Sequence, residues 1–270
     1  MLKNSLSILI AFLAVITFIV VTQQNHSYQT KQVKVSLTAL KVPPLASDKN
    51  PVPDFNKYED VAIKKEKFFA YLLPEVKRQN QIITAERHAV SALFSLYKTD
   101  GAFNKQQQAV FDYLVKKYTV EYETLDTAVF EELLIKVDTV PEALVLVQGA
   151  IESGWGTSRF AKKGYNFFGL WCFKEGCGFV PKQRNDGAAH EVAKFKDLSH
   201  GVMTYMRNIN RLYAYEDLRA LRAAKRNEGK AITAEVLSTG LLSYSERGQE
   251  YIDELLNMLR VNKQYMGLGS

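Results

Sequence analysis

The chain has 270 residues, of which 47% are hydrophobic and 24% are charged, and its formal net charge is +6. This composition is typical of a folded globular protein and excludes a disordered chain, a collagen and a multi-span membrane protein. The mild basic excess favours anionic partners, but no nucleic-acid-binding motif accompanies it. The densest basic cluster predicts a solvated helix face; it comprises Arg219, Arg222, Lys225, Arg226 and Lys230.

An apolar segment over residues 6–22 follows Lys3 and is typical of a targeting sequence. Its length lies between a signal-peptide core and a full membrane span of about 20 residues. No Ala-x-Ala pattern follows it, so we expect an uncleaved membrane anchor at residues 1–22, with a removed signal peptide as the alternative. Residues 23–53 contain four prolines and predict a flexible linker. Export to the cell envelope, anchored to the membrane or free in the periplasm, is the natural reading.

Helical periodicity dominates the remaining domain, residues 54–270. We predict a helical N-terminal part over residues 54–138 and a catalytic core over residues 139–262. Pro141 and Gly154 predict the start and the end of one helix in that core. Further helices are predicted over residues 198–215, 217–227 and 246–260.

One stretch of the core has a different pattern. Asn185-Asp186-Gly187 is a turn signal between two short apolar runs, and it predicts a β-hairpin of residues 178–183 and 190–196. The predicted fold class is therefore α+β and mainly α, with a small β element at one side.

Glu152 is the most informative acid of the chain. Gln148 lies four positions earlier, so both side chains project from one face of the predicted helix. Glu152 falls in the last turn, where the negative end of the helix dipole disfavours a carboxylate. We therefore expect a raised pKa, which suits a carboxylic acid that donates a proton to a glycosidic oxygen.

Aromatic residues crowd the stretch that follows Glu152. Such rings suit stacking against sugars, although a local core would look similar. We assign Trp155 and Phe167 to packing, and leave Trp171 between packing and substrate contact. The stretch contains Trp155, Tyr165, Phe167, Phe168, Trp171 and Phe173.

Cys172 and Cys177 are the two cysteines. They form no zinc pattern, and the four histidines do not pair at ligand spacing, so we expect no metal and no cofactor. Outside the cytoplasm the two cysteines can close a short disulfide loop, and two free buried thiols are the alternative.

The motif around Glu152 resembles a known family. Glu152-Ser153-Gly154-Trp155-Gly156, Ser158, Ala161 and Asn166-Phe167-Phe168-Gly169 are similar to the core signature of the peptidoglycan N-acetylglucosaminidases, which include the flagellar muramidase domain. Trp171-Cys172, Gly176-Cys177-Gly178 and Val180-Pro181 are similar to the subgroup of bacterial Bax proteins. The resemblance runs from about Asp54 to the end of the chain.

The resemblance implies a lysozyme-like fold of two lobes with a glycan cleft between them, and Glu152 as the general acid. The resemblance also implies that Tyr244, the first residue of a segment that ends in Tyr251, lies in the cleft near the reacting sugar. Tyr251 is expected to pack in the protein core. Glu191 in the hairpin is the candidate second carboxylate, with Asp186 and Glu175 as competitors. The predicted substrate contacts are Gln148, Ser153, Asn166, Phe168 and Trp171.

The predicted function is cleavage of the β-1,4 glycosidic bond in peptidoglycan glycan strands by general acid catalysis. Without a second carboxylate, the N-acetyl group of the substrate could act as the nucleophile. The alternatives are a lytic transglycosylase and a non-catalytic protein that binds peptidoglycan. The predicted partners are glycan strands and, through the N-terminal segment, the membrane; no nucleic acid is expected.

Overall fold

The computed structural model describes residues 35–45, 51–181 and 190–269. Within these residues, no helix is both long enough and apolar enough to cross a bilayer. The predicted anchor lies outside the described residues. The helices are α2 (Val61–Asp100), α3 (Lys105–Tyr118), α4 (Thr127–Lys136), α5 (Glu142–Ser153), α6 (Arg159–Gly164), α7 (Leu198–Arg211), α8 (Glu216–Asn227), α9 (Ala234–Ser238) and α10 (Gln249–Asn262), with short 3₁₀ turns η2 (Phe55–Lys57), η3 (Tyr213–Tyr215), η4 (Thr239–Leu241) and η5 (Lys263–Tyr265).

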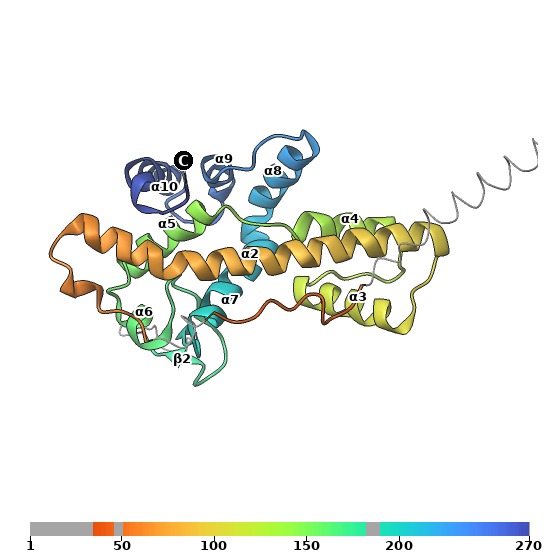
Figure 1. Ribbon diagram of the computed structural model, residues 1–270, viewed down its shortest axis with the longest axis horizontal. Helices are drawn as coiled ribbons and strands as arrows, with labels where there is room; N and C mark the ends of the chain where they lie inside the picture. Colours follow the sequence, from red (N-terminus) through yellow and green to blue (C-terminus); the bar gives the residue numbers. More distant parts are fainter. Residues whose placement is uncertain (1–34, 46–50, 182–189, 270) are drawn as a thin grey trace, which may run out of the picture. The chain divides into compact units, whose positions relative to one another are not determined.

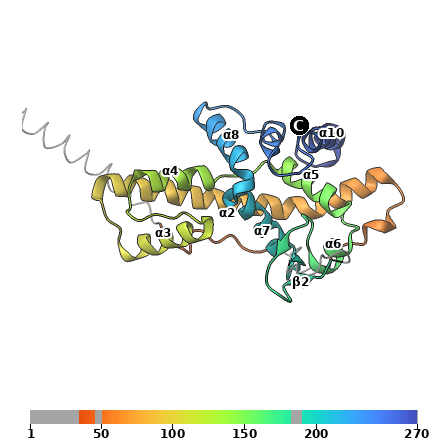
Figure 2. The same cartoon turned by 180° about the vertical axis from the view of Figure 1, so that it is seen from behind.

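Helix α2 is the central element, and α3, α4, α5 and α7 pack against it (Figures 1 and 2). It begins at Asp60, whose carboxylate accepts the backbone N–H groups of Ala62 and Ile63. It ends at Gly101, which has a left-handed φ of 68°. Its buried residues recur at helical spacing from Phe68 to Leu93 and form one broad face, which includes the polar side chains of Glu75, Gln79, Asn80 and Glu86.

Helix α5 confirms the predicted helix between Pro141 and Gly154. Pro141 is its N-cap, and Gly154 ends it with a left-handed φ of 55°. All residues from 144 to 150 are buried, so only the two ends of α5 reach the surface. The helices predicted over residues 198–215, 217–227 and 246–260 are also confirmed, as α7 with η3, as α8 and as α10.

The small sheet has the strand order β1-β3-β2, with both pairs antiparallel. The predicted hairpin is confirmed by the pairing of Phe179 with Val192. A third strand, which was not predicted, adds Trp171 opposite Val192. Residues 182–189 lie outside the described residues. The domain is thus mainly helical α+β, and the strands are β1 (Trp171–Cys172), β2 (Gly178–Phe179) and β3 (Glu191–Ala193).

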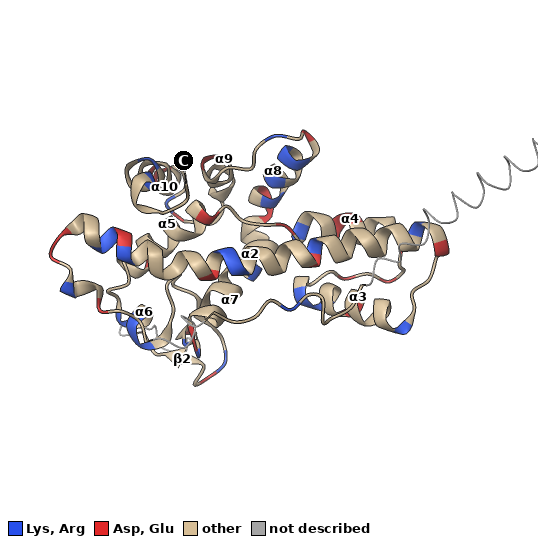
Figure 3. Ribbon diagram, in the orientation of Figure 1, with Lys and Arg blue, Asp and Glu red and all other residues tan. Residues whose placement is uncertain are grey.

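Figure 3 shows the positions of Lys and Arg along α8. The prediction of a solvated basic face is wrong for two of these arginines. Arg222 is 0% exposed, and Arg219 is also buried. Arg222 donates to the carbonyls of Ile135 and Lys136 at the end of α4, at 3.1 and 3.3 Å. Arg219 donates to Ile209 O at the end of α7, at 2.8 Å. These side chains satisfy helix carbonyls that have no partner within their own helix.

Part of the predicted flexible linker is bound to the domain. Arg78 of α2 donates from Nε to Pro43 O at 2.6 Å and from Nη2 to Val42 O at 3.1 Å. Leu40 is buried. Residues 36–45 therefore lie against the helical domain, which differs from the expectation of a free spacer.

Candidate active site

Glu152 lies in the last turn of α5, and its side chain is exposed. Gly169 lies beside it, where an added Cβ atom would come within 3.3 Å of Glu152 Oε2. The φ of Gly169 is +63°, a left-handed value that also favours glycine. The carboxyl group can therefore be reached by a substrate while one side of it is closely covered by backbone.

A chain of hydrogen bonds leads from the core to Glu152. The Tyr205 hydroxyl donates to Gln148 Oε1, and Gln148 Nε2 donates to the Tyr251 hydroxyl at 3.0 Å. Tyr251 in turn donates to the Glu152 carboxylate. Gln148 and Tyr205 are buried, and Tyr205 also stacks on Phe168 at a ring distance of 3.9 Å. Three helices, α5, α7 and α10, thus fix the direction of one carboxyl group.

The pKa of Glu152 is raised, as predicted, but the causes differ from the predicted effect of the helix end. Although Glu152 has exposed surface, the protein around its carboxyl group partly desolvates it, which is the largest cause, and the negative charge of Glu254 on α10 comes next. The hydrogen bond from Tyr251 and the positive charge of Arg247 act in the opposite direction. A carboxyl group in this environment keeps its proton to a higher pH than a free glutamic acid.

Tyr244 is part of the same cluster. Its ring lies 5.0 Å from that of Tyr215 and 5.6 Å from that of Tyr251. Burial, and then the charge of Glu152, raise the pKa of Tyr244 to about 12. Tyr244 therefore stays a neutral phenol at physiological pH and can donate a hydrogen bond. The structure brings together Glu152, Gln148 and Tyr244, which the sequence singled out.

Four of the five predicted substrate contacts are buried: Gln148, which joins Tyr205 to Tyr251 as described above, and Ser153, Asn166 and Phe168. Ser153 Oγ donates to Gly149 O and accepts Gly156 N–H at 2.8 Å, so it shapes the turn after α5. The Asn166 amide bonds the backbone of Leu170 and Ala193, which ties the stretch after α6 to β3. Phe168 stacks on Tyr205. The geometry favours a positioning role for Ser153, Asn166 and Phe168 over the predicted direct contact.

Glu191 is 4% exposed in β3. Its two carboxylate oxygens accept the N–H groups of Gly176 at 3.0 Å and Gly178 at 2.7 Å. A carboxylate held in this way favours a structural role over the predicted role of base or nucleophile. Of its predicted competitors, Glu175 is exposed on the loop after β1, and Asp186 lies outside the described residues.

A disulfide joins Cys172 to Cys177, as one of the two alternatives expected. Together with Glu191, these cysteines are the group of metal-ligand side chains found among the described residues. Their sulfur atoms are bonded to each other, so they are not available as thiolate ligands. Trp171, directly before this loop, is 50% exposed, which fits a substrate contact better than packing. Trp155 packs on Phe68 and Phe69, as predicted.

Sequence reasoning missed Tyr251, Glu254 and Arg247 as parts of the site. Arg247 and Glu254 form an ion pair at 2.7 Å. Tyr251 and Glu254 are three residues apart on α10 and so share a helix face. That spacing was the available signal, but only the packing of α10 on α5 reveals that this face meets Glu152.

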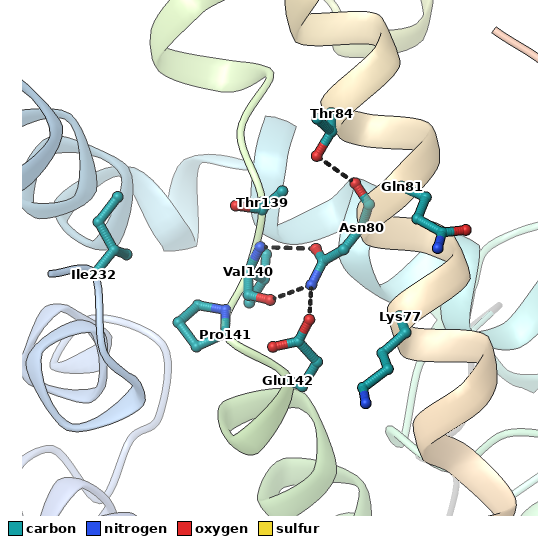
Figure 4. A pocket seen from close by; sticks show the side chains of 9 residues that line it. All are labelled: Lys77, Asn80, Gln81, Thr84, Thr139, Val140, Pro141, Glu142 and Ile232. Carbon is teal, nitrogen blue, oxygen red and sulfur yellow. Dashed lines mark hydrogen bonds between the residues drawn. The ribbon is translucent and has the colours of Figure 1, made fainter. Parts of the chain in front are cut away.

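The other end of α5 borders a separate cavity of about 600 Å³ (Figure 4). Asn80 of α2 bonds the N–H and the carbonyl of Val140, and it donates to Glu142 Oε1 at 2.9 Å. These bonds hold the first turn of α5 in place. Ten residues of helix, about 15 Å, separate Glu142 from Glu152, so this cavity is not the site of the proposed acid.

The comparisons with known proteins point to one family. Residues 127–264 match the model of the glucosaminidase family, described as mannosyl-glycoprotein endo-beta-N-acetylglucosaminidase. The protein bax of Escherichia coli strain K12 is 29% identical over 214 residues, which cover 79% of this chain and 75% of that protein. No solved structure matches the chain.

Proposed function

Because this chain belongs to the glucosaminidase family, we propose that it hydrolyses the β-1,4 glycosidic bond in the glycan strands of peptidoglycan, with Glu152 as the general acid. The observation that carries the proposal is the environment of Glu152. An exposed carboxyl group with a raised pKa is held at the end of a buried helix by a directed hydrogen bond from Tyr251. Proton donation at neutral pH needs an acid of this kind.

In the proposed reaction, Glu152 gives its proton to the glycosidic oxygen as the bond from that oxygen to the anomeric carbon breaks. The oxygen keeps the bonding electron pair and leaves as a hydroxyl group. Water then adds to the anomeric carbon, and its proton returns to the Glu152 carboxylate. Over both steps one water is consumed and the enzyme is regenerated.

We propose that the N-acetyl group of the sugar supplies the nucleophile: its carbonyl oxygen bonds to the anomeric carbon as the glycosidic bond breaks, and the incoming water later displaces this oxygen. Both oxygens of Glu191 are engaged by backbone N–H groups, and Glu254 is paired with Arg247. A neutral Tyr244 can donate a hydrogen bond to the charge that develops near the sugar ring. This mechanism uses one enzyme carboxyl group, first as acid and then as base.

Digestion of purified sacculi tests the proposal. Wild-type protein and Glu152→Gln are incubated with the same sacculi, and the released fragments are identified by mass. We expect new reducing ends at N-acetylglucosamine, and a loss of at least about a hundredfold in rate for the variant. If the wild type releases fragments no faster than Glu152→Gln, the enzymatic proposal fails and glycan binding without catalysis remains.

Lytic transglycosylation is the second candidate, and the engagement of Glu191 favours it. A single acid suffices when a hydroxyl group of the sugar itself closes on the anomeric carbon. The same digestion separates the two reactions, because transglycosylation leaves anhydro-muramic ends and consumes no water.

The proposed substrate places the protein in the cell envelope, and we propose that residues 6–22 direct it there. The Cys172–Cys177 disulfide supports an oxidising compartment. Fractionation of cells tests the membrane anchor, because deletion of residues 1–22 should move the protein from the membrane fraction to the soluble fraction.

A further inference from the structure

Two large aromatic side chains are exposed next to each other in the segment that leaves Glu152. Trp171 is 50% exposed and Phe173 is 80% exposed. Both follow Gly169, which meets the Glu152 carboxylate. Single exposed aromatic residues are common on protein surfaces, but two that lie two positions apart, at the end of a strand and in the loop after it, favour a surface that contacts a partner.

Trp171 belongs to β1, and Phe173 is the first residue after this strand. In β1, Trp171 lies opposite Val192, and its ring meets the edge of His190 at 4.7 Å. Cys172 projects to the other face, where its disulfide lies near the Glu191 carboxylate. Phe173 lies two positions after Trp171, and this spacing favours a position for its ring on the same side as Trp171.

The loop that carries Phe173 is clamped twice. The disulfide closes residues 172–177, and the buried Glu191 carboxylate accepts the N–H groups of Gly176 and Gly178. Aromatic rings on a fixed loop lose little conformational freedom when a ligand binds. Glu191 is therefore suited to fix the shape of this loop, while a ligand binds to the aromatic side chains of the loop.

We propose that Trp171 and Phe173 form an aromatic track that binds the glycan strand beside the catalytic acid, and that Glu191 is the positioning residue of this track. The inference rests on the proposed function. Phe173 lies four residues beyond Gly169, at most about 14 Å along an extended chain, so both rings lie close to the residue that meets the Glu152 carboxylate. Flat sugar rings can stack on both side chains.

A lipid surface is the other partner that exposed aromatic rings can meet. Membrane-binding segments combine such rings with an excess of Lys and Arg. Here the tip of the loop carries Lys174 and Glu175, whose charges cancel. The neutral tip favours a glycan over an anionic bilayer.

Co-sedimentation with purified sacculi tests the track without interference from cleavage when every variant also carries Glu152→Gln. We expect Trp171→Ala and Phe173→Ala each to weaken binding about tenfold, and Phe173→Tyr to retain it. Tyr213→Ala is the matched control, because Tyr213 is an 85% exposed aromatic residue on η3, outside this loop. Circular dichroism verifies that each variant is folded.

The role of Glu191 is read from kinetics with the active enzyme. If Glu191 only positions the loop, Glu191→Gln should raise KM with little change in kcat. Reduction of the disulfide by dithiothreitol should also weaken binding to sacculi. Cys172→Ser with Cys177→Ser should already bind weakly and should not respond to dithiothreitol. A fall of kcat by about a hundredfold at unchanged KM would instead make Glu191 a catalytic carboxylate and overturn this part of the proposal.

These experiments distinguish a failure of the aromatic track from a failure of the proposed function. If Glu152→Gln hydrolyses sacculi like the wild type, the proposed function fails. If that variant is inactive but Trp171→Ala and Phe173→Ala bind sacculi like their parent, only the track is wrong. Loss of binding to vesicles of phosphatidylglycerol and phosphatidylethanolamine, with sacculus binding intact, would assign the rings to a membrane and would also overturn the track.

Discussion

At the scale of single residues, two opposite charges act on Glu152: Glu254 on α10, and Arg247 in the turn before that helix. Burial and the negative charge of Glu254 raise the pKa of Glu152, whereas the Tyr251 hydrogen bond and the Arg247 charge lower it. Glu152 serves as an acid only while it is protonated. Catalysis is therefore present below its pKa and is lost as the pH rises through it.

Substitution of Arg247 or of Glu254 should shift the pH at which activity is lost, and the two substitutions should shift it in opposite directions. Glu254→Gln removes a negative charge and frees the Arg247 charge, so the pKa of Glu152 falls and activity is lost at a lower pH. Arg247→Gln removes a positive charge and leaves Glu254 unneutralised, so activity persists to a higher pH. The pH dependence of kcat measures both shifts.

Glu250→Gln is the matched control for this pair. It removes the same charge from the same helix, but Glu250 is not among the groups that act on Glu152. Its pH profile should coincide with that of the wild type. Shifts of equal sign in Glu254→Gln and Arg247→Gln would contradict the assignment of charges around Glu152.

Tyr251→Phe should lower kcat by roughly tenfold to a hundredfold, because it removes a hydrogen bond to a carboxylate that is worth about 1.5–3 kcal/mol. It should also raise the pKa of Glu152, so the remaining activity should extend to a higher pH. The pH profile separates this outcome from general damage to the fold, which would lower activity without moving the profile. Tyr213→Phe, an exposed tyrosine on η3, should change neither quantity.

At the scale of elements, α8 stabilises the ends of its neighbours through buried arginines. Burial lowers the pKa of Arg222 to about 10, so it remains charged at neutral pH. It donates to Asn210 Oδ1 at 2.8 Å as well as to the carbonyls that follow α4. One side chain thereby joins α4, α7 and α8.

Arg222→Met should destabilise the domain by about 3–5 kcal/mol, because the buried carbonyls lose their donor. For a domain of this size the melting temperature should fall by roughly 10 °C. Thermal unfolding followed by circular dichroism measures the change. Lys230→Met, which removes an exposed charge after the same helix, should stay within about 0.5 kcal/mol of wild type. Equal effects of the two variants would contradict the capping role of Arg222.

The elements that sequence predicts well are those with local signals at their ends. Pro141 and Gly154 delimit α5 because a cap depends on a few neighbouring residues. Helix α2 also has such end signals, in Asp60 and Gly101, but Pro74 interrupts its pattern and its buried face includes polar residues such as Glu86. The burial of Glu86 depends on partners in other elements, such as the Tyr118 hydroxyl of α3, which the sequence of α2 alone does not contain.

The residues of the candidate site also divide into those that local sequence signals predict and those that they do not. Glu152 and Tyr244 could be predicted because a motif and a helix end mark them. Tyr251 and Glu254 could not, since their part in the site depends on the contact between α5 and α10, a hundred residues apart in the chain. Arg222 was misassigned for the same reason: a basic residue on a helix predicts a solvated position unless the facing carbonyls are known.

At the scale of the whole molecule, the guanidinium group of Arg78 binds the segment of residues 36–45 to the domain. Arg78 bonds Pro43 O and Val42 O while it also pairs with the buried Glu75 at 2.8 Å. Arg78→Lys keeps a positive charge near Glu75 but loses the planar fork that reaches both carbonyls. We expect the rate of amide hydrogen exchange in residues 36–45 to rise about tenfold, with the exchange rate of α2 unchanged.

Lys77→Arg, at the exposed neighbouring position, is the control and should leave the exchange rates of both segments unchanged. Unchanged exchange in Arg78→Lys would show that burial of Leu40, and not these hydrogen bonds, keeps the segment in place.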